Sequence, residues 1–255
     1  MTKINLLNNP NMDGPFISHG AGEVAVAKHW TPLWRGPNDQ PPMQDNQGPL
    51  ARPEYKPLYR TQFPYRVQNG DSSQCWFLTH KVFDACVYQR VDVEVGAWYC
   101  MSANVQAWSS NGDDHTKSER EMYVSLGLMP INRPDPWQLG TVYTGWDWVG
   151  ANFKRVYSYI VQAQHSVMWA IVRAWPKWKG LHNDFILDHV ELYKVAGPVP
   201  GPDLPDNPSP TEPGTCAFDW ERFRAELREE LSNSYSLPQN LEGSWTVEGT
   251  ITPTP

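Results

Sequence analysis

Apolar and polar residues alternate along many segments of the first 195 positions, most clearly in residues 97–109. A period of two is typical of a β-strand with one buried face and one solvated face. Clusters of Gly, Pro, Asn and Asp separate these segments, which predicts short antiparallel strands joined by turns. The expected strands are residues 4–7, 23–29, 74–81, 86–95, 97–109, 120–128, 154–162, 167–175 and 185–195.

The remaining parts of this region lack the alternation. Residues 31–73 and 110–119 are rich in proline and polar residues, and we expect long loops there. No helical pattern of useful length occurs before residue 215. The pattern therefore predicts an all-β, antiparallel β-sandwich over residues 1–196.

The composition changes after residue 196. Residues 197–214 form a proline-rich linker, which is expected to be extended and semi-rigid. Residues 215–255 follow, with a predicted amphipathic helix at 219–231 and a predicted strand at 244–252. One face of the helix carries the apolar residues Trp220, Phe223, Leu227 and Leu231. Since so short a helix is marginal alone, we expect 215–255 to dock on other subunits or another structural protein, with its own sandwich as the second choice.

Charge and terminal sequence exclude several classes of partner. The net charge is −7 and no Lys/Arg cluster occurs, which argues against nucleic acid. No apolar run reaches the length of a membrane span, and the first residues lack the apolar stretch of a secretory signal. We therefore expect a protein made in the cytoplasm without a signal peptide, with the virion as a candidate final location.

The four cysteines are Cys75, Cys86, Cys100 and Cys216. Three fall inside expected strands and none has the spacing of a zinc site. Buried thiols are the preferred interpretation, with disulfides as the alternative.

Motifs at both ends of the predicted sandwich point to a family. The predicted sandwich opens with Asn-Leu-Leu-Asn-Asn-Pro-Asn-Met-Asp at 5–13 and closes with Asn-Asp-Phe-Ile-Leu-Asp-His-Val-Glu-Leu at 183–192. Between them lies Val-Asp-Val-Glu-Val-Gly-Ala-Trp-Tyr at 91–99, where Val95 replaces a usual proline. In this order the motifs resemble those of jelly-roll carbohydrate-binding modules of the xylan- and glucan-binding kind, over residues 4–195.

The resemblance implies a jelly-roll fold and a structural calcium ion near the two chain ends. Carried over to this sequence, its carboxylate ligands would be Asp13 and Asp188. Oxygen-only ligation suits calcium. Two positions depart from the family pattern, since Asp13 is shorter than the usual Glu and His189 replaces a second Asp. The alternative is that Asp13 caps a turn and Asp188 binds backbone.

The sequence contains no motif that predicts catalysis. Glycoside hydrolysis needs two facing carboxylates, and the acidic residues here are scattered. The triplet 113–115 (Asp-Asp-His) fits a solvated turn better than a metal site. We therefore expect a protein that is not an enzyme.

The chain is rich in the side chains that bind sugars. It has 13 Trp, more than a core of this size needs, and sugar sites combine aromatic faces with planar hydrogen-bonding groups. If the strands 97–109 and 167–175 share a sheet, their polar faces converge beside the loop that follows. The ligand-binding candidates are Asn104, Gln106, Trp108, Arg173, Trp175, Trp178, His182 and Asn183.

The tryptophans of these two strands and of the loop that follows carry different expectations. Trp175 and Trp178 flank Pro176 and Lys177 in an expected loop, so they are the preferred platform. Trp108 fits core and surface equally, and Trp169 fits the core. A second aromatic cluster is either another platform or a loop folded onto the sandwich edge, and it comprises Trp137, Tyr143, Trp146 and Trp148.

Three hypotheses for function follow. The first is a non-catalytic glycan-binding or adhesion module, mounted on a larger assembly through residues 215–255. The second is a phage virion structural protein, a capsid-decoration or tail component, that uses the jelly roll as a packing unit. The third, an enzyme of unrecognised type, has least support, because no catalytic motif is present.

Overall fold

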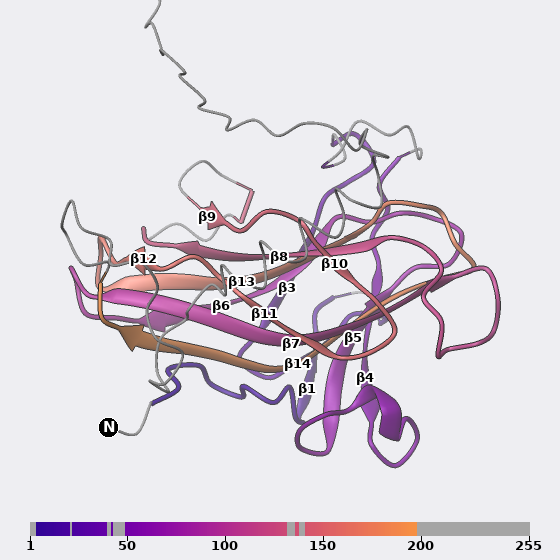
Figure 1. Cartoon of the computed structure of the whole chain (residues 1–255), viewed down its shortest axis with the longest axis horizontal. Coiled ribbons are helices and arrows are strands. Elements are labelled where there is room, and N and C mark those ends of the chain that lie inside the picture. Colours follow the sequence, from indigo (N-terminus) through magenta and orange to yellow (C-terminus); the bar gives the residue numbers. More distant parts are fainter. Residues whose placement is uncertain are drawn as a thin grey trace, which may run out of the picture. The chain divides into compact units, whose positions relative to one another are not determined.

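Two antiparallel β-sheets of six strands each pack face to face (Figure 1). The computed structural model describes residues 4–20, 22–39, 42, 49–131, 136–137 and 141–197. One sheet has the order β11-β7-β14-β5-β4, with β12 also paired to β7, and is named here the β7–β14 sheet. The other, the β8–β13 sheet, has the order β10-β8-β13-β6-β3, with β9 also paired to β8. The predicted all-β antiparallel sandwich is confirmed.

The strands of the β7–β14 sheet are β4 (Glu54–Tyr59), β5 (Ser72–Phe77), β7 (Trp98–Ser110), β11 (Lys154–Tyr157), β12 (Val161–Gln162) and β14 (His182–Val195). Those of the β8–β13 sheet are β3 (Thr31–Trp34), β6 (Ala85–Asp92), β8 (Met122–Met129), β9 (Val142–Tyr143), β10 (Asp147–Val149) and β13 (Val167–Pro176). A separate two-stranded sheet pairs β1 (Phe16–Ser18) with β2 (Ala25–Ala27), and one 3₁₀ turn, η1, spans Pro64–Arg66.

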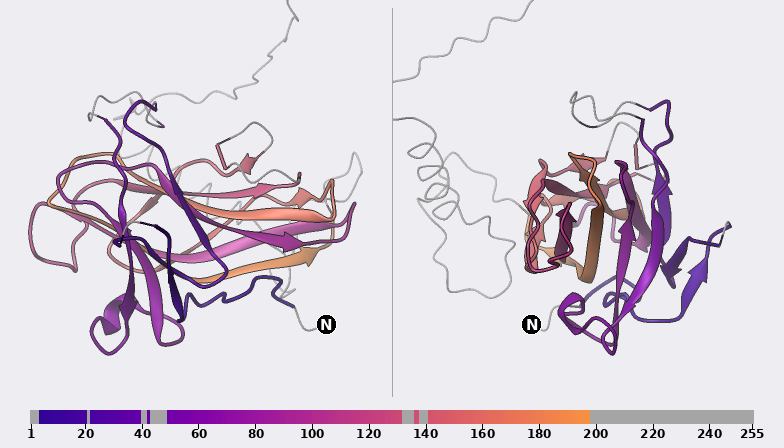
Figure 2. Two further views of the ribbon diagram at one scale, coloured as in Figure 1. Left: turned by 180° about the vertical axis from the view of Figure 1, so that it is seen from behind. Right: turned by 90° about the vertical axis from the view of Figure 1, so that its right-hand side faces the viewer.

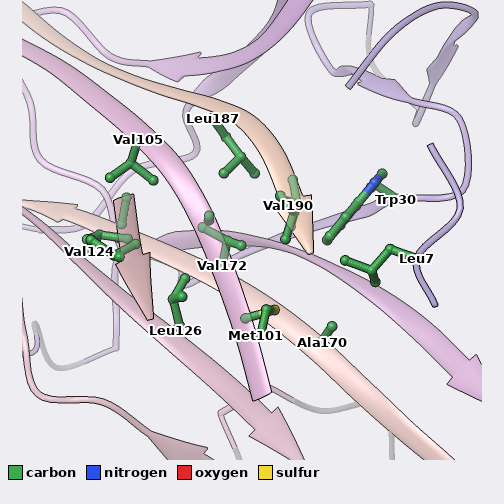
Figure 3. Packing of buried hydrophobic residues seen from close by; sticks show 14 of the residues in the cluster. Leu7, Trp30, Met101, Val105, Val124, Leu126, Ala170, Val172, Leu187 and Val190 are labelled. Atoms are coloured by element: carbon green, nitrogen blue, oxygen red, sulfur yellow. The ribbon is translucent and has the colours of Figure 1, made fainter. Parts of the chain in front are cut away.

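The core lies between the two sheets, as the alternation predicts. In β7 the side chains of Tyr99, Met101, Ala103, Val105 and Ala107 are buried in the main apolar cluster. Figure 3 shows residues of β7 and β14 facing residues of β8 and β13 across this layer. The opposite positions of each strand therefore form the two outer faces of the sandwich.

A β-bulge in β14 keeps the inward pattern in register. The pairing with β7 shifts between Asp188 and Val190, and His189 has a positive φ of 45°. One extra residue in a strand would otherwise reverse every side chain beyond it. Because of the bulge, Leu187 and Val190 both point into the core.

The prediction of one long loop over 31–73 is wrong, because β3, β4 and η1 lie within it. Pro32 lies in β3 and Pro57 in β4, and each strand is the last one in its sheet. Proline lacks an N–H, so it is tolerated on edge strands. The violet segment around η1 projects beyond the long strands in Figure 1 and in the left view of Figure 2.

Other expected boundaries also differ. Residues 4–7 do not form a strand, although the N–H of Leu6 donates to the carbonyl of Leu192. The expected strand 154–162 is two short strands, β11 and β12, and the region of the second aromatic cluster contains β9 and β10.

Cys75 and Cys86 are buried as thiols, as expected. Cys100 is disulfide-bonded, so the preferred expectation of a thiol is wrong at that position. Within the ranges given above, no helix is long and apolar enough to span a bilayer. Apart from Gly197, the predicted linker (197–214) and attachment element (215–255), with Trp220, Phe223, Leu227 and Leu231, lie outside the described residues.

Candidate functional site

Four strand ends meet at one end of the sandwich. The end of β7 lies opposite the start of β14, and the start of β8 lies opposite the end of β13. The N–H of Lys177 donates to the carbonyl of Glu121 over 2.9 Å. The segment 119–121 and the turn 176–181 are thus held side by side.

A shallow depression opens between these two segments, with a volume of about 490 Å³. Its lining consists of Glu119, Arg120, Glu121 and Trp178. Trp178 is 38% exposed, and its Nε1 donates to Oε2 of Glu121 over 2.9 Å. The indole is therefore held in place by its polar edge, while part of its apolar surface faces solvent.

Glu121 interacts with three neighbouring side chains. The Tyr123 hydroxyl donates to its Oε1 over 2.7 Å, and Lys177 Nζ lies 3.1 Å from its Oε2. These hydrogen bonds, that from Tyr123 first and that from Trp178 next, hold the pKa of Glu121 below its ordinary value. Glu121 stays ionised and so does not fit the part of a general acid.

Asn183, one of the predicted ligand contacts, instead positions the Trp178 turn. Its side chain is buried, and its Nδ2 donates to the carbonyls of Lys81 (3.0 Å) and Trp178 (2.9 Å). Its Oδ1 accepts from the Ser109 hydroxyl over 2.6 Å. Since these bonds occupy the amide, Asn183 supports the site from below.

His182 and Trp108 lie in a stack on the outer face of the β7–β14 sheet. Their ring centroids are 3.7 Å apart with planes 13° from parallel. The Arg66 guanidinium lies 4.9 Å from the Trp108 ring and forms a buried ion pair with Asp184 at 2.8 Å. His182 therefore contacts Trp108 on the outer face of the β7–β14 sheet, and it does not line the depression at Trp178.

The stack continues beyond Arg66. The guanidinium lies 5.7 Å from the Tyr65 ring, which stacks on His115 at 4.1 Å. Sequence reasoning missed Tyr65 and Arg66, because they lie in the proline-rich segment taken for a loop. The Arg66–Asp184 pair joins residues 118 positions apart, which no local pattern signals.

Two further predicted contacts, Asn104 and Gln106, are buried on the same outer face. Gln106 Nε2 donates to the carbonyls of Tyr65 (3.3 Å) and Ala151 (2.5 Å). It thus holds the segment around η1 and the turn before β11 against the sheet. Its amide nitrogen serves packing rather than a ligand.

The predicted convergence with Arg173 and Trp175 is wrong. Both lie on β13, in the other sheet, and their side chains are on its outer face. Trp175 is fully buried against Leu50 and Val82, because it belongs to the strand and not to a loop. A single sequence shows that a strand alternates, but it does not show which sheet the strand joins.

Arg173 is instead enclosed by the second aromatic cluster. It binds the fully buried Asp84 through two hydrogen bonds of 2.7 and 2.5 Å. Its guanidinium carbon lies 4.6 Å from the ring of Trp137, 5.5 Å from Tyr143 and 4.9 Å from Trp146. Trp137, Tyr143 and Trp146 thus cover the sheet, which matches the interpretation as a loop folded onto the sandwich edge. Trp148 remains 51% exposed.

The triplet 113–115 forms a polar turn, as preferred from the sequence. Asp114 accepts from the N–H and the hydroxyl of Thr116, and these bonds with Lys117 lower its pKa to about 2. Within the described part of the chain, no three His, Cys, Asp or Glu side chains are grouped to hold a metal.

Asp13 and Asp188 reach the same short segment from two directions. Asp13 Oδ1 accepts from the N–H groups of residues 71 and 72, and Asp188 Oδ2 from those of 68 and 69. Asp188 is fully buried, and burial raises its pKa to about 6 despite these hydrogen bonds. Its Oδ1 has no hydrogen-bond partner among the described residues. The pattern matches the backbone-binding alternative and leaves one buried oxygen that suits a hard cation.

Comparison with known proteins finds similarity only in solved structures. No family model matches the chain, and no curated protein matches it. Carbohydrate-binding modules are among its structural neighbours. TmCBM61, solved with β-1,4-galactotriose, has a TM-score of 0.46 and 11% identity over 75% of this chain and 99% of its own.

Two more neighbours illustrate the range. The C-terminal family 22 carbohydrate-binding module of Clostridium thermocellum Xyn10B has a TM-score of 0.36 and 13% identity over 66% of this chain and 88% of its own. The enzymatically active domain of tailspike protein 4 of bacteriophage CBA120 has a TM-score of 0.41 and 11% identity over 73% of this chain and 22% of its own. At such TM-scores, no ligand or site residue can be transferred to this chain.

Proposed function

We propose that this chain is a non-catalytic glycan-binding module, mounted on a larger assembly through residues 215–255. The observation that carries the proposal is the depression at Trp178. A partly exposed indole, fixed by its N–H, lies among two carboxylates and a guanidinium. An apolar sugar face can stack on the ring while its hydroxyls bond to the surrounding polar groups.

The same geometry favours binding over catalysis. Glu121 is held ionised by three partners, and Glu119 Oε2 accepts from the Ser110 hydroxyl over 3.2 Å. Glycoside hydrolysis requires one carboxyl group that stays protonated as a general acid. The lining offers positioned hydrogen-bonding groups in a shallow, open site, which suits recognition of a chain that passes across it.

A glycan array tests the proposal with two matched variants, Trp178→Ala and Trp148→Ala. Trp148 is also exposed but lies on β10, outside the lining. We expect W178A to bind at least about tenfold more weakly than the unaltered chain, which corresponds to about 1.4 kcal/mol. W148A should bind like the unaltered chain. Equal binding by W178A would contradict the proposal.

The phage virion structural protein remains the second candidate, and a specific sequence feature supports it. The proline-rich linker and the apolar helix face of residues 215–255 fit a protein that is assembled into a particle. Electron microscopy of the native assembly, with the chain located by a specific antibody, tests this proposal. Absence of the chain from every particle would count against it.

A further inference from the structure

A row of side chains points outward from the edge strand β11. Arg155 lies opposite Asn104 and Tyr157 opposite Ser102, both of which are on the outer face of β7. Val156, between them, points into the core. β11 ends at Tyr157, and Ser158 is bound to the backbone of Met101 through its N–H and its hydroxyl. Tyr159 follows directly and is also exposed.

The two tyrosines are among the most exposed aromatic residues described. Tyr157 is 49% exposed and Tyr159 is 56% exposed. Only one residue separates them in the sequence, so we expect the two rings to offer neighbouring contacts to one sugar chain. The Arg155 guanidinium carbon lies 5.9 Å from the Tyr157 ring, on the side toward β14.

A partly exposed polar network borders this row. Arg155 pairs with Glu191 and donates to the Ser102 hydroxyl over 2.8 Å. His189 Nε2 lies 3.2 Å from Glu191 Oε1, and its Nδ1 lies 2.8 Å from Asn11 Oδ1. Because each group is held by a neighbour, the guanidinium and the carboxylate are oriented before any ligand arrives. Such preorganisation lowers the entropic cost of binding.

We infer that Arg155, Tyr157, Tyr159 and Glu191, named here the tyrosine strip, form a second glycan-binding site that takes an uncharged oligosaccharide. This inference rests on the proposed glycan-binding function. Sugar rings stack on the two tyrosines, and their hydroxyls bond to the outward edges of the ion pair. Stacking supplies affinity and the fixed pair supplies orientation.

The chemistry of the strip favours a sugar over other ligands. Arg155 and Glu191 neutralise each other, so the strip has no excess charge to attract a polyanion or an anionic lipid surface. The Arg155–Glu191 ion pair borders the tyrosines, whereas a stable protein interface needs about 800 Å² per partner around an apolar centre. At four residues, β11 is also short for pairing with a strand from another chain.

The tyrosine strip and the Trp178 depression are far apart on the same module. Tyr157 pairs with Ser102, whereas the Trp178 turn precedes the residue that pairs with Ser110. Eight residues of extended strand span about 26 Å. We expect a polysaccharide that is long enough to span this distance and to pass from the outer face to the Trp178 depression to bind at both sites. Two linked contacts strengthen binding by about 10²–10⁴-fold over either one alone.

The test compares the full chain with Y157A/Y159A, W178A and the control Tyr59→Ala. Tyr59 is 43% exposed on β4, away from the strip. The probes are xylohexaose, β-1,4-galactotriose, xylan and galactan, measured by calorimetry for the oligosaccharides and by affinity electrophoresis for the polymers. Thermal melting verifies that each variant is folded, which the surface position of the substituted side chains favours.

With an oligosaccharide that binds, we expect two molecules per chain, one per chain in Y157A/Y159A, and two in Y59A. Binding of the polymer should fall at least about tenfold in Y157A/Y159A. If Y157A/Y159A keeps the stoichiometry and the polymer binding of the unaltered chain while W178A binds more weakly, the tyrosine strip is overturned. The proposed function then still stands. Loss in Y157A/Y159A with none in W178A would support the strip and overturn the Trp178 site. Binding of none of the four probes by the unaltered chain overturns both.

Discussion

Burial disfavours the ionised form of the Asp188 carboxyl group. It is fully buried, two backbone N–H groups bind one of its oxygens, and its pKa is raised to about 6. An aspartate in an unfolded chain has a pKa of about 3.9. The folded protein therefore binds this proton more tightly than the unfolded chain does, and the group contributes more stability at pH 4 than at pH 7.

The first prediction concerns this pH dependence, measured by urea unfolding in the presence of a chelator. As the pH falls from 7 to 4, the unfolding free energy of the unaltered chain should gain about 2 kcal/mol relative to Asp188→Asn, which cannot titrate. The difference should appear between about pH 6 and pH 4. A constant difference between the two proteins would contradict the raised pKa.

Calcium gives the same carboxyl group a different behaviour. We propose that an ion held by Asp13 and Asp188, with backbone carbonyls, is the reason for the unpartnered Oδ1. Bound calcium would keep Asp188 ionised and raise the melting temperature at pH 7, because it binds only the folded state. The melting temperature is measured with calcium and with chelator in the unaltered chain, D13A and D188N. If calcium and chelator give the same melting temperature in all three proteins, the proposed ion is contradicted.

At the scale of single elements, the close packing of the second aromatic cluster (Trp137, Tyr143, Trp146 and Trp148) on β8 depends on Gly127. A Cβ at this position would lie 2.5 Å from Cε1 of Tyr143, whose ring packs beside Arg173. Gly145, in the same cluster, has no atom within 4 Å of its own Cβ position. These two glycines thus differ sharply in the space available for a side chain.

The second prediction is that Gly127→Ala destabilises the protein by about 1–3 kcal/mol, since the Tyr143 ring must leave its packed position. Gly145→Ala should change stability by less than about 0.5 kcal/mol. The midpoints of urea unfolding measure both effects. Equal midpoints for the two variants would show that the Tyr143 ring can move without a loss of stability, which would contradict the prediction.

The success of sequence reasoning at this scale followed the strength of the local signal. β7 and β13 alternate over 13 and 10 residues, and the sequence predicts both. β3 and β4 contain proline and lie at sheet edges, where pairing from one side is enough. The bulge at His189 depends on pairing with a distant strand, and no local pattern reports it.

The candidate site was less predictable than the fold. The sequence makes Trp178 a candidate because a large aromatic side chain in an expected loop is hard to explain by packing, and the structure shows this side chain partly exposed. The role of Asn183 depends on carbonyls brought near it by folding, and Arg173 was misplaced because strand order is a property of the whole sheet. Tyr157 and Tyr159 lie in an expected strand, but exposure at its edge emerges only once β11 has a single neighbour in its sheet.

At the scale of the whole molecule, the third prediction concerns residues 215–255. If the apolar helix face is the attachment surface, Leu227→Asp should abolish self-association or attachment, because it puts a charge into that face. Arg222→Asp, off that face, should leave both intact. Light scattering and an incorporation assay measure these outcomes. Normal assembly by L227D and by a chain that ends at residue 214 would show that the attachment lies elsewhere.

The prolines of β3 and β4 have a consequence for crowding. An exposed strand edge is a template on which another copy can add a strand, and repeated addition yields fibrils. Pro32 and Pro57 interrupt the row of N–H donors on the last strand of each sheet, so that neighbouring copies find a poor template there. If many copies of the module are displayed on one surface, identical copies are present at high local concentration. The two prolines would thus limit strand addition at β3 and β4 when copies of the module lie close together.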